Sequence, residues 1–134
     1  MTPPDSLISH SNPIEAKTKQ LVETILNLPA VIKFSKTEFI QEKYGPISIY
    51  FDQDTIGRNI STIFQRGRSL QLLHRLDSIN SEVRPCYVFT KITINHDEAY
   101  AYMTFDITGA IAYGNLKYID GNWLPDKDFV IGVR

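Results

Sequence analysis

The chain has 134 residues, of which 43% are apolar and 22% are charged, and its formal net charge is −1. This length fits one ordinary domain with its own core, and the composition is not that of a disordered chain. The balanced charge gives no reason to expect binding to nucleic acid or to an anionic membrane. No apolar run approaches the ~18–20 residues of a membrane span, and the single cysteine, Cys86, excludes an internal disulfide.

Residues 1–12 are rich in Pro and Ser and almost unpatterned, which predicts a flexible leader. The leader is either a disordered start or a tether that follows a removed export or lipoprotein signal. A cytoplasmic protein is the default expectation, and an exported or lipoprotein-tethered protein is the alternative. Residues 13–134 are expected to form a single α+β domain.

The first predicted helix begins at Pro13, because Asn12 can cap it and Glu15 completes a capping box. Pro29 ends it. Its apolar residues share one stripe, typical of a helix that packs across a sheet: Ile14, Leu21, Val22, Ile25 and Leu28.

A second, shorter helix is predicted by the S-x-x-E capping box of Ser35 and Glu38. It ends near Tyr44, where Gly45-Pro46 breaks the pattern. Two aromatic residues occupy the positions of a hydrophobic staple: Phe34 and Phe39.

The middle of the chain is less regular. The run 47–51 (ISIYF) predicts a short strand, and residues 52–54 predict a turn. Residues 55–65 combine helical spacing with β-branched composition, so helix and strand are equally favoured. After Gly67, Ser69 can cap a helix whose leucines line one side: Leu70, Leu73 and Leu76.

The last third of the chain, Val83 to Val133, contains four runs rich in Tyr, Ile, Val, Phe and Thr, separated by three turn signals. Such residues fit a half-buried pleated surface, so the segment predicts a four-stranded antiparallel meander. Asp120-Gly121 is the strongest hairpin signal, because this dipeptide tolerates the positive φ angles of a tight turn. The expected fold is therefore α+β, with N-terminal helices packed on a curved antiparallel sheet that ends in this meander.

The second run of the meander predicts two different faces, because neighbouring strand residues point to opposite sides. One face carries Ala99, Ala101, Met103 and Phe105, and the other carries Tyr100, Tyr102, Thr104 and Asp106.

The order of these elements resembles that of the NTF2-like (cystatin-like α+β cone) superfamily. The run from Glu98 to Gly109, followed by an Asp-Gly turn and a Trp between Leu116 and Trp123, is similar to the last hairpin of that family. The resemblance implies a helix-covered curved sheet with a cavity between the layers, frequently in a homodimer. Enzymatic members place an acid–base pair such as Asp–His or Asp–Tyr inside the cone, and no such pair matches here by motif. No catalytic residue is therefore carried over.

Tyr100, Tyr102 and Asp106 are the main candidates for a binding site. If their face lines the cone, they form a polar, aromatic pocket wall for a small ligand. In the other interpretation, the tyrosines lie at a dimer face or under a helix, and Asp106 caps the turn that follows its strand.

Several other residues carry weaker signals. Arg66 and Arg68 are candidates for contacting an anion, especially if Ser69 opens a helix, and otherwise form a solvated basic turn. His74 and Asp77 would share a helix face, as a base with its orienting carboxylate or as a solvated ion pair. The consecutive residues 96–98 (HDE) are interpreted as a polar turn, so no metal site is expected, and no cofactor is expected elsewhere.

The resulting prediction is a non-enzymatic binding or protein-interaction module of unknown specificity, forming a homodimer through its sheet. A protein partner or a small ligand is expected rather than nucleic acid. The alternative is a small-molecule enzyme or carrier that uses a cone-shaped pocket lined by Asp106, Tyr100 and Tyr102.

Overall fold

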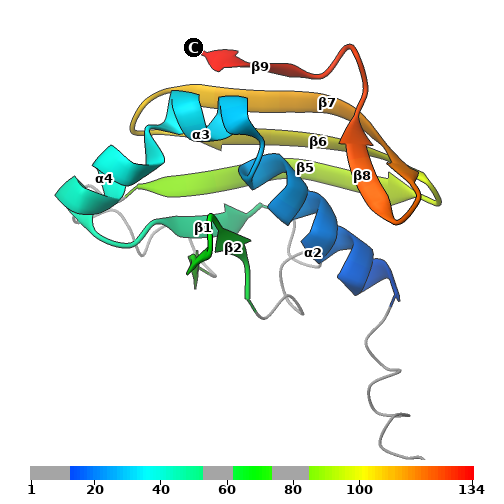
Figure 1. Cartoon of the computed structure of the whole chain (residues 1–134), viewed down its shortest axis with the longest axis horizontal. Coiled ribbons are helices and arrows are strands. Elements are labelled where there is room, and N and C mark those ends of the chain that lie inside the picture. Colours follow the sequence, from blue (N-terminus) through cyan, green and yellow to red (C-terminus); the bar gives the residue numbers. More distant parts are fainter. Residues whose placement is uncertain (1–12, 53–61, 74–84) are drawn as a thin grey trace, which may run out of the picture.

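Three helices and nine strands form the described part of the chain, which comprises residues 13–52, 62–73 and 85–134 of the computed structural model (Figure 1). The leader at 1–12 lies outside these residues. The helices are α2 (Pro13–Leu26), α3 (Pro29–Ser35) and α4 (Thr37–Tyr44). The strands are β1 (Ser48–Phe51), β2 (Phe64–Gln65), β3 (Arg68–Ser69), β4 (Gln71–Leu73), β5 (Cys86–Asn95), β6 (Glu98–Phe105), β7 (Ala110–Ile119), β8 (Asn122–Pro125) and β9 (Val130–Val133).

The main sheet runs in the order β4-β1-β5-β6-β7-β8, with β9 also paired to β7. It is mixed: β1 is parallel to both β4 and β5, and the remaining pairs are antiparallel. The α+β class is confirmed, but a purely antiparallel sheet is wrong. Parallel neighbours need a long crossover connection, and here residues 52–85 supply it between β1 and β5.

The C-terminal run of the meander is not one strand. It divides into β8 and β9, which both pair with β7, at residues 116–119 and 110–113 respectively. Gly114 lies between these two stretches with φ +142°, and a Cβ there would come within 2.8 Å of Phe129 Cα. The loop joining β8 to β9 therefore crosses β7 at the one position where β7 has no side chain.

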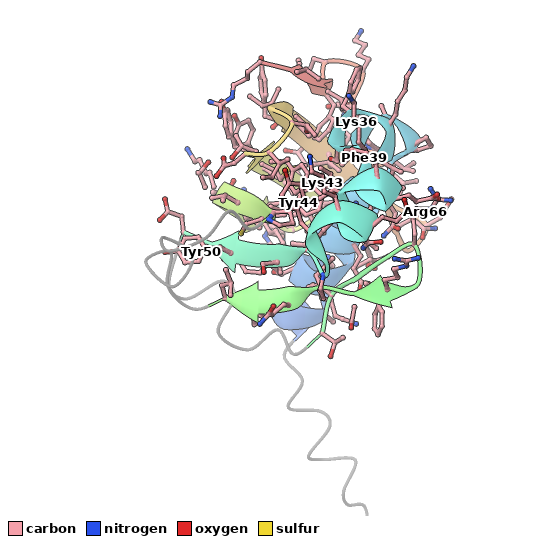
Figure 2. The ribbon with its side chains drawn as sticks, turned by 90° about the vertical axis from the view of Figure 1, so that its left-hand side faces the viewer. Lys36, Phe39, Lys43, Tyr44, Tyr50 and Arg66 are labelled. Atoms are coloured by element: carbon pink, nitrogen blue, oxygen red, sulfur yellow. The ribbon has the colours of Figure 1, made fainter. Side chains whose placement is uncertain are left out.

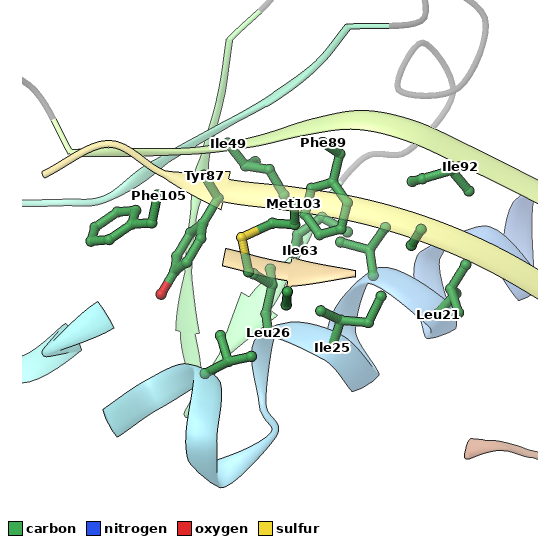
Figure 3. Packing of buried hydrophobic residues seen from close by; sticks show 14 of the residues in the cluster. Leu21, Ile25, Leu26, Ile49, Ile63, Tyr87, Phe89, Ile92, Met103 and Phe105 are labelled. Carbon is green, nitrogen blue, oxygen red and sulfur yellow. The ribbon is translucent and has the colours of Figure 1, made fainter. Parts of the chain in front are cut away.

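The helices cover one face of the sheet, and the core lies between them (Figures 1 and 3). Leu21, Val22 and Ile25 of α2 are buried as predicted. Trp123 of β8 is also buried, and its Nε1–H donates to the carbonyl of Lys17 at 3.1 Å. The indole thus anchors the C-terminal hairpin to α2 within the core.

The helical region differs from the prediction at one junction. Helix α2 ends at Leu26, and Pro29, predicted to end it, starts α3 at a first-turn position where a missing N–H costs nothing. Ser35 is the last residue of α3 and is buried, so it does not cap α4. Lys36 separates the two helices in the left-handed conformation, with φ 54° and ψ 47°. Helix α4 then ends at Tyr44, before Gly45, as expected.

The helix predicted after Ser69 is wrong for the residues that the structure describes. Ser69 pairs with Phe64 in the β2–β3 hairpin, and Leu72 pairs with Ile49 at the edge of the main sheet. Sheet pairing overrides the helical spacing of these leucines. For the segment 55–65, residues 64–65 are strand, and the uncertain part at 55–61 lies outside the described residues.

Candidate functional site

The predicted alternation of β6 is confirmed for residues 99–103, whereas Thr104, predicted on the tyrosine side, is buried. Ala101, Met103 and Phe105 are fully buried under the helices, whereas Tyr100 and Tyr102 are half-buried on the opposite side. The strand register assigns neighbouring residues to the same side as these tyrosines. We call this side the open face; it comprises Lys91, Thr93, Tyr100, Tyr102, Ile111, Tyr113, Lys117, Leu124 and Val130.

The open face carries an aromatic pair at its centre. The rings of Tyr102 and Tyr113 stack with their centroids 5.2 Å apart and an interplanar angle of 21°. The ammonium of Lys91 lies 5.7 Å from the ring centroid of Tyr100. Tyr100 also lines a small hollow of about 150 Å³ on this face. These tyrosines thus form a raised aromatic patch on the sheet surface. None of them lines the larger groove described below.

Asp106 is exposed in the turn that joins β6 to β7. Its charge acts on Cys86, which is buried at the start of β5. Burial, and secondarily the negative charge of Asp106, raises the pKa of the Cys86 thiol from its ordinary 9.0 to about 12. The thiol stays protonated at neutral pH and donates to the carbonyl of Tyr87 at 3.4 Å. Cys86 therefore packs as a small hydrophobe and is not an activated nucleophile.

A groove of about 670 Å³ lies at one end of the molecule, where α3 and α4 meet the β6–β7 turn and the end of β9. Its apolar walls come from three segments distant in sequence. We call it the α3–α4 groove; it is lined by Lys33, Phe34, Lys36, Phe39, Ile40, Tyr44, Ile107, Thr108 and Val133. Phe39, Tyr44 and Val133 are 57%, 37% and 52% exposed, so apolar rims face water.

The charge of the α3–α4 groove is positive. Lys33 and Lys36 line it, and no described carboxylate does. Lys43 lies beside it, with its ammonium 5.9 Å from the ring centroid of Phe39 and 5.4 Å from that of Tyr44. Figure 2 shows the side chains gathered around α4: Lys36, Phe39, Lys43 and Tyr44.

The groove was not identified in the sequence. Phe39 was interpreted as half of a staple, yet it is exposed while its neighbour Ile40 is buried. Two adjacent large apolar residues on a short helix cannot both face the core. The pair Phe39-Ile40 was therefore the sequence signal for an exposed apolar side chain on this helix. The contribution of residues 107–108 and 133 depends on the fold, so local sequence carries no sign of it.

Arg66 and Arg68 lie on the β2–β3 hairpin, and each contacts α4. Arg66 forms an ion pair with Glu38 at 3.1 Å, and Arg68 donates to the side-chain oxygen of Gln41 at 2.5 Å. Because Ser69 is in a strand, no helix N-terminus joins them as an anion site. Their role as anion contacts stays a prediction.

A buried polar cluster, also missed in the sequence, joins the hairpin to the helices. Gln65 is fully buried, and its Nε2 donates to the carbonyl of Leu26 at 2.7 Å and to the Tyr87 hydroxyl at 2.8 Å. The Tyr87 hydroxyl lies 3.4 Å from Thr37 Oγ1. Buried polar groups persist when they are hydrogen-bonded, so this cluster fixes α2, α4 and the hairpin relative to β5.

The remaining candidates that the structure describes do not assemble into a metal site. His96 and Asp97 form the β5–β6 turn, where Lys17 contacts Asp97 at 3.5 Å. Within residues 13–52, 62–73 and 85–134, no group of three or more His, Cys, Asp or Glu side chains is placed to hold a metal ion. His74 and Asp77 lie outside the described residues. None of the described helices is both long and apolar enough to cross a bilayer.

Comparisons with protein-family models, with curated proteins and with solved structures find no significant match to this chain. The geometry alone therefore indicates its chemistry. The α3–α4 groove offers apolar contact and positive charge, and none of its described lining residues can act as a carboxylate, imidazole or thiol catalyst.

Proposed function

We propose that this chain is a non-enzymatic protein-interaction module that binds its partner through the α3–α4 groove. The supporting observation is the exposure of Phe39 and Tyr44 beside Lys33 and Lys36 in a groove of about 670 Å³. Aromatic and cationic side chains around an apolar depression are typical of the residues that dominate protein interfaces.

The energetics favour an occupied groove. Burying apolar surface contributes about 25 cal/mol per Å², so covering one large, half-exposed aromatic ring contributes on the order of 1–2 kcal/mol. Phe39 and Tyr44 both stand to gain this stabilisation. The Lys43 ammonium lies 5.9 Å and 5.4 Å from their ring centroids, and such a cation–π contact strengthens when a partner excludes water from it.

The finer assignment to the NTF2-like superfamily is part of the same proposal. Helices on one face of an α+β sheet and a buried Trp123 after an Asp-Gly hairpin support it. The alternative function, a small-molecule site lined by Tyr100, Tyr102 and Asp106, receives less support. These residues occupy the open face and an exposed turn, where a small ligand would stay largely in contact with water.

We also propose a homodimer through the open face. The stacked pair Tyr102–Tyr113 and the exposed apolar side chains of Leu124 and Val130 support it. Light scattering across a concentration series should then give twice the monomer mass, and Tyr102→Lys should return the protein to monomer. A wild-type monomer at the highest concentration would rule this out.

The interaction proposal is tested by NMR titration of the isotopically labelled protein with a set of short apolar peptides. Amide shifts should cluster on α3, α4 and the end of β9. Phe39→Ala should weaken binding, whereas Phe64→Ala, the same truncation at a 43% exposed ring on the β2–β3 hairpin, should not. If the shifts cluster on the open face, or if no peptide produces any, the proposal is wrong.

A further inference from the structure

Lys36 stands at the junction of the two groove helices in a conformation that costs a side chain energy. Its N–H donates to the carbonyls of Ile32 and Lys33 at the end of α3, and its carbonyl accepts from Ile40 in the first turn of α4. With φ 54° and ψ 47°, it occupies the position that Gly or Asn usually takes at a helix end. Backbone strain of this kind, which Arg66, His96 and Asp120 share, marks a place to look for a functional side chain, and at Lys36 that side chain lines the groove.

The charge of the groove is not neutralised within the described residues. Glu38, on α4, is already paired with Arg66 on the hairpin, and no described carboxylate lies within ion-pairing distance of Lys33, Lys36 or Lys43. Three ammonium groups from the α3–α4 side, those of Lys33, Lys36 and Lys43, therefore lie at or beside an apolar depression. The complementary surface carries carboxylates around an apolar side chain.

The openness of the groove favours a macromolecule over a small ligand. Small ligands are usually buried to about 70–90% of their surface. Here Phe39 and Val133 on the rim are 57% and 52% exposed, so a molecule confined to the groove would leave both in water. A protein segment can fill the depression and cover the rim together.

We propose that the α3–α4 groove binds an acidic segment of a partner protein, with an apolar side chain entering beside Phe39 and Tyr44 and carboxylates pairing with Lys33 and Lys36. Lys36 is then a specificity-determining residue, fixed between two helices so that its ammonium faces an acidic partner. This inference rests on the proposed function and adds the chemistry of the partner.

The test uses the full chain and three dye-labelled amphipathic peptides. They share the same Leu and Phe positions and carry Asp and Glu, Lys and Arg, or neutral Gln and Ser at the polar positions. Fluorescence anisotropy should show the acidic peptide binding at least about tenfold more tightly than the basic one, and added salt should reduce the difference.

The variants separate charge from fold. Lys36→Asn keeps a residue that tolerates the left-handed conformation but removes the ammonium. Combined with Lys33→Glu, it should lower affinity for the acidic peptide about tenfold or more. Lys19→Asn combined with Lys127→Glu makes the same change in net charge outside the groove and the open face, and it should change affinity less than about twofold.

Each outcome is decisive. If all three peptides shift α3–α4 amides with equal affinity, or if Lys33→Glu/Lys36→Asn binds the acidic peptide as the wild type does, the charge inference fails while the interaction proposal stands. If no peptide perturbs the groove, both fail. If decanoate binds more tightly than the acidic peptide and displaces it, the site is for a small amphiphilic anion, and the inference of a protein segment is wrong.

Discussion

Neighbouring residues of strand β6 point to opposite sides of the sheet, and the two sides have different surroundings. Met103 is fully buried between the sheet and the helices, whereas the adjacent Tyr102 is half-buried on the open face and stacks on Tyr113. The helix-covered side holds the apolar core, whereas the opposite side holds, at its tyrosines, cross-strand pairs in contact with water. We therefore expect stability to depend on one face and association on surfaces outside the core.

The largest effect should come from truncating that core. Met103→Ala removes a fully buried side chain and leaves a cavity, so we expect a loss of about 3–4 kcal/mol in the free energy of unfolding. Tyr102→Ala, one residue away, should lose only about 1 kcal/mol, because it removes a half-exposed cross-strand pair. Urea denaturation of both variants measures the difference. Both variants are compared at a protein concentration where the wild type is monomeric, and equal losses there would mean that the open face is packed as tightly as the core.

Gly114→Ala should have the next largest effect. An added Cβ would meet the backbone of Phe129 at 2.8 Å at a φ of +142°, so either the crossing loop or β7 must move. We expect a loss of about 2–3 kcal/mol, seen as a lower Tm. Gly132→Ala is the control, since a Cβ there meets no atom within 4 Å. A neutral Gly114→Ala would contradict the close approach.

Lys36→Gly tests the helix layer that covers the sheet. Removing the Cβ relieves the left-handed strain, so the variant should be more stable by about 0.5–1 kcal/mol despite the greater freedom of Gly when unfolded. Thermal unfolding in buffer without peptide measures this gain. Combined with weaker peptide binding, it would show that stability is given up for recognition at this residue. A destabilised variant would mean that the lysine stem contributes packing that outweighs the strain.

The smallest effect on stability at neutral pH concerns Cys86. This residue lies on the same side of the sheet as the open face, but at the start of β5, where the side chains are buried. Cys86 and its neighbour Ser48 on β1 are each 1% exposed. Because the folded pKa of Cys86 is raised to about 12, the unfolded chain loses this proton first as the pH rises above 9.0. The contribution of the protonated Cys86 thiol to folding stability is therefore fully present below pH 9 and is lost progressively toward pH 12.

The measurement is the free energy of unfolding of wild type and Cys86→Ala across this alkaline range. The wild type should lose more stability between pH 9 and 12 than the variant does, since the remaining titrating groups are common to both. Thiol-reactive dye at pH 8 should modify the native protein far more slowly than the unfolded chain. Parallel pH curves for the two proteins would contradict the burial of the thiol.

Local patterns were sufficient for much of this fold. The alternation along β6, the Asp120-Gly121 hairpin and the end of α4 before Gly45 each depend on neighbouring residues, and each is found as predicted. The predictions that failed concern elements whose structure depends on partners distant in sequence. The parallel pairing of β1 needs β5 beyond a long connection, and Leu72 is in a strand because Ile49 lies beside it.

The candidate site was less accessible to sequence reasoning. Tyr100 and Tyr102 were assigned to the correct side of β6, but the covering of each side is decided by helix packing. The α3–α4 groove joins residues 33–44 to 107–108 and 133, and only the tertiary fold brings these segments together. The sequence also carried no indication that Lys36 is left-handed, because Gly and Asn are the residues that normally mark this conformation.

The pairing of two short strands along one side of β7 also bears on solubility. A long exposed edge strand is a template for pairing with other chains and for aggregation. At this edge, β8 and β9 are only four residues each, and the loop that crosses at Gly114 interrupts them. Pro125 lacks an N–H, and Asp126 and Asp128 add charge to the interruption. The edge therefore offers an incoming strand no continuous ladder, which protects the folded protein against edge-to-edge aggregation.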